Sequence, residues 1–212
     1  MKNNLLKSAN RKELKLKIVR AGEFGNDIKM KISEIFVDGF FQWLNYFSKD
    51  KDKLTKAFSH IFNLEVFYVA VINGEIAGMI ACTDGKVSSV HLESKELKKH
   101  LGFFMGTVAY CVLKRELEEK PYPFDIKKDM GMVEFVATSM KYRGKGVASA
   151  IMNHIFDATP YGVYALQVAD TNTKAVKLYE KLGYTEFVRT KEKHSKQSGI
   201  NYHVYMKYSK EH

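Results

Sequence analysis

The chain has 212 residues, of which 45% are hydrophobic and 13% aromatic. This composition excludes an intrinsically disordered chain and is typical of a globular protein with a buried core. The longest apolar stretch, residues 101–113, is too short to cross a bilayer, and the N-terminus has no apolar segment long enough for a signal peptide. We therefore expect a cytoplasmic protein with no membrane partner.

The formal net charge is +10, and most of it comes from the two ends of the chain. Basic ends can attract nucleic acid, but they are more often solvated segments, so we do not expect a nucleic-acid partner. Cys82 and Cys111 both lie in apolar stretches, which predicts buried, reduced thiols rather than a disulfide or a catalytic cysteine. We predict no metal site.

The first half of the chain predicts a strand, two helices and a hairpin. Residues 14–19 alternate apolar and basic side chains, as in a half-buried strand, and residues 29–47 place apolar side chains at helical spacing. A shorter helix is predicted around residues 51–62. Two apolar runs, 66–72 and 75–83, flank Asn73-Gly74, a pair that favours a two-residue hairpin turn.

The second half of the chain alternates helices and strands. Residues 94–119 predict one continuous helix, which ends before Pro121, and a loop follows over 121–125. The further predicted elements are strands at 132–138, 162–168, 185–190 and 202–208 and helices at 146–156 and 173–182. This order predicts a mixed sheet covered by helices, in one domain over residues 1–212.

A basic, glycine-rich turn, Arg143-Gly144-Lys145-Gly146, precedes the helix predicted at 146–156. Its backbone N–H groups and the positive end of the helix dipole could bind phosphate oxygens, and Arg143 could add charge-assisted hydrogen bonds. The turn matches neither a Walker loop nor the dinucleotide fingerprint, in which Ser149 would have to be glycine. By itself the turn leaves a phosphate site and a solvated basic loop both open.

A second pattern decides between these interpretations. Residues 172–184 fit N-x-x-A-x-x-[LF]-Y-x-x-x-G-[FY], and residues 143–148 fit [RQ]-x-x-G-x-[GA], with one predicted strand between the two. In this order they resemble the GNAT superfamily of acetyl-CoA-dependent N-acetyltransferases, over about Met132 to Tyr208. The resemblance implies an α/β fold with a central mixed, mostly antiparallel sheet and helices on both faces.

One segment departs from the family pattern. Residues 86–131 form an insertion with a long helix before the fourth strand, where the family usually connects the third and fourth strands directly. Its apolar face, which includes Leu97, Leu101 and Phe104, favours core or interface over catalytic apparatus. We therefore name this helix as the candidate interface of a homodimer.

The resemblance implies acetyl-CoA as the cofactor and an unidentified amine as the acceptor. The glycine-rich turn would bind the pyrophosphate, and the backbone of the strand before it would pair with the pantetheine amides. The residues predicted to bind the cofactor are Val136, Ala137, Thr138, Arg143, Gly144, Lys145, Gly146, Val147, Ala148, Asn172, Ala175 and Tyr179.

Two residues are predicted to be catalytic. Tyr179 has the family's position for the proton donor to the leaving thiolate, although a buried tyrosine that packs its helix on the sheet is the alternative. Glu134 is the candidate base because an ionisable carboxylate inside an otherwise apolar strand often has a functional role. A glutamate that faces solvent is the alternative interpretation. Asp170 and a water chain are the reserve bases. Asn172 would position the cofactor, or simply cap its helix.

The acceptor remains open. Candidate wall residues are Phe36, Phe40, Trp43, Tyr46, Tyr202, His203 and Tyr205, although the helical spacing of the first four also fits a core. The basic ends do not favour a polycationic acceptor unless the pocket is locally acidic. A non-catalytic acyl-CoA-binding regulatory module is the alternative function.

Overall fold

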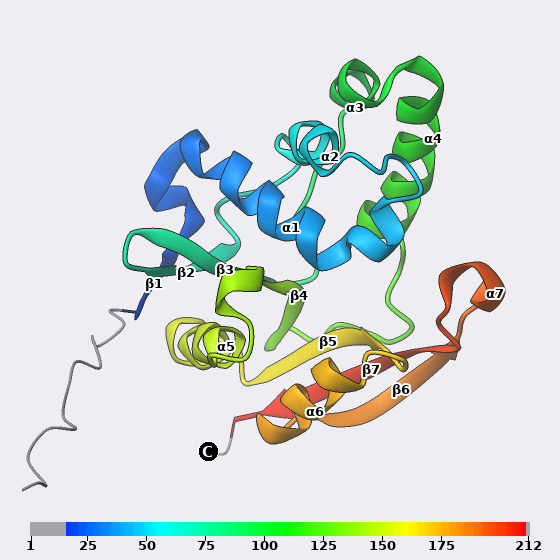
Figure 1. The fold of residues 1–212 in the computed structure, drawn as a ribbon. Coiled ribbons are helices and arrows are strands. Elements are labelled where there is room, and N and C mark those ends of the chain that lie inside the picture. The colour runs from blue at the N-terminus through cyan, green and yellow to red at the C-terminus, as the bar shows by residue number, and fades with distance from the viewer. Residues whose placement is uncertain (1–15, 211–212) are drawn as a thin grey trace, which may run out of the picture.

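A computed structural model of the protein describes residues 16–210 (Figure 1). The first two residues of the strand predicted at 14–19, and most of the basic N-terminal segment, lie outside this range. In chain order the elements are β1 (Leu16–Arg20), η1 (Ala21–Asp27), α1 (Ile28–Leu44), α2 (Lys51–Phe58), β2 (Phe67–Ile72), β3 (Glu75–Thr83), α3 (Ser94–Leu101), α4 (Phe103–Leu113), η2 (Lys114–Glu118), β4 (Met130–Thr138), η3 (Met140–Tyr142), α5 (Val147–Ala158), β5 (Val163–Ala169), α6 (Thr173–Lys181), β6 (Thr185–Lys191), α7 (Ser195–Ser198) and β7 (Tyr202–Ser209).

The strands form one sheet in the order β1-β2-β3-β4-β5-β7-β6, in which only β4 and β5 run parallel. Helices α1 to α4 pack on one face, and α5 and α6 pack on the other (Figure 1). The prediction of a mixed, mostly antiparallel sheet with helices on both faces is therefore confirmed. No helix within residues 16–210 is long and apolar enough to cross a membrane.

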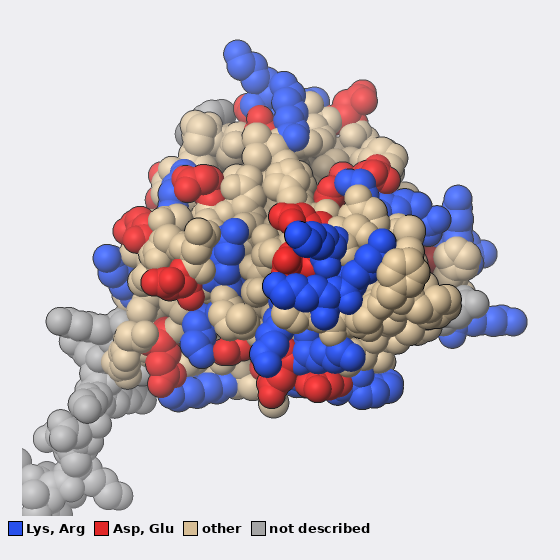
Figure 2. Space-filling view, turned by 90° about the horizontal axis from the view of Figure 1, so that it is seen from above, with Lys and Arg blue, Asp and Glu red and all other residues tan. Residues whose placement is uncertain are grey.

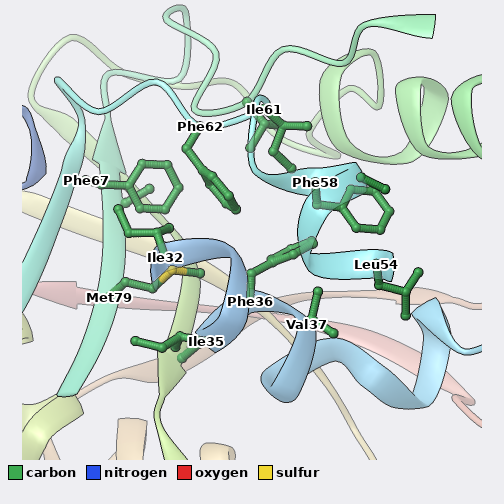
Figure 3. Close-up of a cluster of buried hydrophobic side chains, with 14 of the residues drawn as sticks. Ile32, Ile35, Phe36, Val37, Leu54, Phe58, Ile61, Phe62, Phe67 and Met79 are labelled. Carbon is green, nitrogen blue, oxygen red and sulfur yellow. The ribbon is translucent and has the colours of Figure 1, made fainter. Parts of the chain in front are cut away.

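The larger core lies between α1 and the first half of the sheet (Figure 3). Ile32 and Phe36 recur at helical spacing on α1 and are buried against Phe58 of α2, Phe67 of β2 and Met79 of β3. Burying each such side chain contributes roughly 1.5–3 kcal/mol, which fixes α1 on the sheet. Phe36, one of the candidate acceptor residues, is thus part of the core, with only 2% of its surface exposed.

Two local backbone features, a hairpin turn and a β-bulge, shape the sheet. Asn73 and Gly74 both have positive φ, as the predicted hairpin turn requires.

The second feature lies where β4 pairs with β3. Ala81 of β3 pairs with Glu134, and Met79 of β3 pairs with Ala137, so β4 carries one extra residue and forms a β-bulge. Phe135, at φ 53°, is the left-handed residue of this bulge and packs toward α1.

The insertion is helical, but the prediction of one continuous helix is wrong. The chain breaks at Gly102, at φ 85°, and α4 folds back against α3. A Cβ on Gly106 would lie 2.5 Å from the Cα of Lys98, so this glycine allows the two helices to pack closely. The two glycines, and not the apolar pattern, decide the local structure.

The outer side of α4 leaves several apolar side chains uncovered. Phe103 and Phe104 are 78% and 77% exposed. Cys111 is also exposed as a free thiol, so the prediction that it is buried is wrong. Cys82 is buried, as predicted. Figure 2 looks onto this end of the molecule and shows basic and acidic side chains interspersed around uncharged surface. The homodimer stays a prediction.

Candidate active site

The two parallel strands separate in the middle of the sheet. Residues Met130–Val133 of β4 pair with Val163–Leu166 of β5. Beyond these residues both strands continue without pairing to each other. A cavity of about 490 Å³ lies at this point. Its walls include four predicted site residues, two from β4 and two from α6 and its N-cap: Glu134, Val136, Asn172 and Tyr179.

The carboxylate of Glu134 is half-buried at the cavity wall and accepts two hydroxyl hydrogen bonds. Tyr122 donates to Oε1 and Ser89 donates to Oε2. Burial, and then the negative charge of Glu134, raise the pKa of Tyr122 far above its usual range. The phenol therefore stays protonated and acts as the donor.

Tyr179 and Asn172 reach the same cavity from α6. Tyr179 is 5% exposed, and burial raises the pKa of its phenol well above 10, so the group is neutral across the physiological range. Asn172 caps α6, since its Oδ1 accepts a hydrogen bond of 3.2 Å from the N–H of Ala175. The capping role of Asn172 is thus observed, and the residue lines the cavity as well.

The glycine-rich turn lies at the start of α5, outside this cavity. Gly144 and Gly146 have φ of 74° and 77°, and a Cβ built on either would meet no atom within 4 Å, so a ligand can approach the backbone closely. Within the described chain, the N–H groups of Gly144 and residues 146–148 make no backbone hydrogen bond, whereas that of Lys145 bonds to Tyr142 O. These free donors at a helix start fit a pyrophosphate.

The side chain of Arg143, whose predicted contact with the cofactor stays a prediction, makes hydrogen bonds within the chain. Its Nε donates to the carbonyl of Thr138 at 3.2 Å, and a terminal nitrogen donates to the carbonyl of Asp38 at 3.4 Å. Arg143 therefore ties the turn to the end of β4 and to α1, which positions the free N–H groups. Ala137 and Thr138 are paired with β3 on one side, and their other edge faces the separation from β5.

The acetyltransferase (GNAT) family profile matches residues 31–184 of the chain. The chain belongs to this family. Among curated proteins, none matches it in sequence.

Solved structures with the same fold cover nearly the whole chain. An N-acetyltransferase from Staphylococcus aureus Mu50 has a TM-score of 0.58 at 18% identity and covers 91% of this chain and 100% of its own. The protein yncA from Salmonella typhimurium, solved with its cofactor acetyl-CoA, has a TM-score of 0.56 at 14% identity, covering 93% and 95%. The ribosomal-protein-S18-alanine N-acetyltransferase from Escherichia coli has 0.51 at 13%, covering 92% and 93%.

Asp170, the reserve base in this GNAT chain, does not line the cavity. Its carboxylate accepts hydrogen bonds from the backbone N–H and the side-chain amide of Asn201, at 3.1 and 3.2 Å. Burial by itself would raise the pKa of Asp170, but these and neighbouring N–H donors lower it overall. The residue anchors the connection between β6 and β7.

The candidate acceptor residues divide into two groups. Those that line the cavity are Phe40, Trp43 and Tyr205. Tyr46 is 70% exposed, and the ring of His203 is held between Glu192, at 2.5 Å, and the amide of Gln167, at 2.7 Å. Gln167 lines the cavity, but His203 and Glu192 do not, so the structure does not bring His203 to Glu134.

Sequence reasoning missed the contribution of the insertion to this GNAT site. Residues 85–89 and 116–122 form a wall of the cavity, and they include both hydrogen-bond donors to Glu134, Ser89 and Tyr122. The aromatic residue between two prolines, Pro121-Tyr122-Pro123, was the only local signal, because prolines restrict the backbone around it.

Proposed function

We propose that the protein is an N-acetyltransferase that moves the acetyl group of acetyl-CoA to a primary amine of a small molecule or a protein by direct attack. Glu134 is the base and Tyr179 the proton donor. The observation that carries the proposal is the cavity where β4 and β5 separate, because a carboxylate and a protonated phenol line it together.

The cofactor part of the proposal rests on backbone groups. Acetyl-CoA would supply an activated thioester carbonyl. Gly144, Gly146, Val147 and Ala148 would hold the pyrophosphate through their free N–H groups, with Arg143 fixing the turn and Lys145 adding charge. The unpaired edge of β4 around Val136 to Thr138 would hold the pantetheine amides. Asn172 and Ala175 would form the start of α6 beside it.

The acid–base part rests on the states of the two side chains. An ammonium cannot attack a carbonyl, so the carboxylate of Glu134 takes its proton, directly or through one water. Tyr179 gives a proton to the leaving sulfur, which the raised pKa of its phenol allows because the proton is still present at neutral pH. General acid–base assistance of this kind contributes about 10²–10⁴-fold to a rate.

The charge of the cavity supports a cationic acceptor. Its charged lining residues are the glutamates Glu116, Glu118, Glu119 and Glu134 and the lysines Lys86 and Lys120. The chain as a whole has a net charge of +10, so this excess of carboxylates is local to the cavity. A locally acidic pocket is what a cationic amine acceptor requires in a basic protein. The aromatic rings of Phe40, Trp43 and Tyr205 add surfaces for the cation or its apolar part.

A panel of amines tests the function. Release of free thiol from acetyl-CoA should depend on the amine and should be fastest for cationic amines with an apolar or second cationic part. Binding of acetyl-CoA without amine-dependent release across the panel would instead support the non-catalytic acyl-CoA-binding module.

A further inference from the structure

The two ends of the insertion meet at Glu134. Ser89 follows β3 and Tyr122 precedes β4, and each hydroxyl donates to a different oxygen of the same carboxylate. Ser89 is only 2% exposed, and Tyr122 is half-buried. Both side chains line the cavity beside the proposed base.

A carboxylate at this position needs such donors. Glu134 lies in β4 between Val133 and Phe135, where its side chain is half-buried beside apolar neighbours, and a polar group in such a setting needs hydrogen-bond partners. Hydroxyl hydrogen bonds stabilise the charged form and fix the direction of both oxygens. Each oxygen keeps a further lone pair for an N–H of the acceptor or for a water.

We propose that Tyr122 and Ser89 are positioning residues that keep Glu134 ionised and aimed into the cavity, so that the insertion completes the acid–base machinery. The inference rests on the proposed role of Glu134 as the base. The apolar face of the insertion stays the predicted core or interface, and its two ends would serve the active site.

The hydrogen bonds to Glu134 are not the only ties that hold this segment. The N–H of His91 donates to the carbonyl of Ile61 at 2.8 Å, and the side-chain amide of Asn63 donates to the carbonyl of Ser88 at 3.1 Å. An isolated bridge also joins Phe62 to Val90. Removal of the Ser89 hydroxyl should therefore leave this end of the insertion in place, and Tyr122→Phe keeps the ring that packs beside Phe124.

Neither substitution removes any other titratable group near the carboxylate. The charged side chains around the cavity are Lys86, Glu116, Glu118, Glu119 and Lys120. Glu116 pairs with Lys120, and Glu118 pairs with Lys114 from η2. The neutral groups are the phenols of Tyr179 and Tyr205 and the thiol of Cys82, whose pKa burial raises to about 12.

The test is the pH dependence of kcat/KM for Tyr122→Phe and Ser89→Ala. Loss of a donor destabilises the carboxylate, so the pKa of Glu134 rises and the protonated, inactive form persists to higher pH. We expect the acidic limb to move up by roughly one pH unit in each variant, since a hydrogen bond to a charged group is of that size. Ser89→Thr should restore the wild-type limb.

A matched control separates this effect from damage to the insertion. The hydroxyl of Ser88, the adjacent serine, donates to the carbonyl of Val90 at 2.6 Å and not to Glu134. Ser88→Ala should therefore leave the acidic limb in place. A purely structural role for Tyr122 and Ser89 would lower the rate at all pH values and move no limb.

A carboxyl ¹³C NMR titration of Glu134, assigned with Glu134→Gln, gives a readout that needs no acceptor. The carboxyl pKa should rise in both hydroxyl variants relative to the wild type and to Ser88→Ala. An unchanged carboxyl pKa in both variants overturns the inference. Failure of the wild type to acetylate any amine would overturn the proposed function instead, and the titration would still decide the role of the two hydroxyls.

Discussion

The two sides of the proposed site are built in different ways. On the proposed cofactor side, the groups offered are backbone N–H groups at Gly144 and Gly146, outside the cavity, and the free edge of β4. On the proposed acceptor side, the groups are side chains that line the cavity, such as Glu134, Trp43 and Tyr122, which come from separate elements. Recognition by backbone requires glycines and a helix start at fixed spacing, whereas recognition by side chains requires only that distant residues meet.

The largest effect is expected on the acceptor side, from Glu134→Gln. The amide has nearly the same shape but cannot take the proton of the amine, so kcat/KM should fall by roughly 10²–10⁴-fold. The dissociation constant of acetyl-CoA, measured by calorimetry, should change little because the cofactor side is intact. Equal losses in cofactor binding and in rate would contradict this separation of the two sides.

This difference also explains what could be predicted from the sequence. The turn at residues 143–148 and the pattern at 172–184 were recognisable because their spacing is local, and the structure has α5 and α6 where these motifs predict helices. The contacts of Glu134 with Tyr122 and Ser89 span 12 and 45 residues, and no periodicity marks them. The break at Gly102 was missed because the apolar pattern continues through it.

The proposed role of Tyr179 as proton donor joins the two sides, and Tyr179→Phe tests it. Loss of the proton donor should lower kcat by about 10²-fold, with little change in acetyl-CoA affinity. Because burial raises the pKa of this phenol, its ionisation should produce no basic limb in the wild-type pH profile below about pH 10. An unchanged kcat in the variant would remove the assigned role of Tyr179 and leave the fold unaffected.

Gly146→Ala should weaken the cofactor side alone. Gly146 starts α5 at φ 77°, where a side chain is strained and would hold phosphates away from the N–H groups. We expect about tenfold weaker binding of acetyl-CoA, measured by calorimetry. Gly74→Ala is the control, since Gly74 has a similar φ of 81° in the β2–β3 hairpin and open space around it. Gly74→Ala should lower the free energy of unfolding by a similar amount and leave the affinity for acetyl-CoA unchanged.

Trp43→Ala should act on the acceptor side alone. The ring lines the cavity from α1, so its loss should raise the KM of a cationic amine by roughly threefold to tenfold and leave the KM of acetyl-CoA unchanged. Phe41→Ala removes a half-buried aromatic side chain of the same helix that does not line the cavity. An equal rise in the amine KM for both variants would show that α1 acts through general packing.

The smallest effect is expected from Tyr184→Phe. Like Tyr179→Phe, this substitution removes one phenol hydroxyl, and the centroids of the two rings lie 5.9 Å apart. The hydroxyl of Tyr184 is buried and has no hydrogen-bond partner within residues 16–210, and burial raises the pKa of this phenol. Its removal should leave kcat unchanged and increase the free energy of unfolding by up to about 1 kcal/mol, measured with urea. Above about pH 10 the wild type should lose further stability, because the phenol ionises first in the unfolded chain, and the variant lacks that loss. A fall in kcat comparable to that of Tyr179→Phe would mean that the two tyrosines act through packing, because Tyr179 lines the cavity and Tyr184 does not.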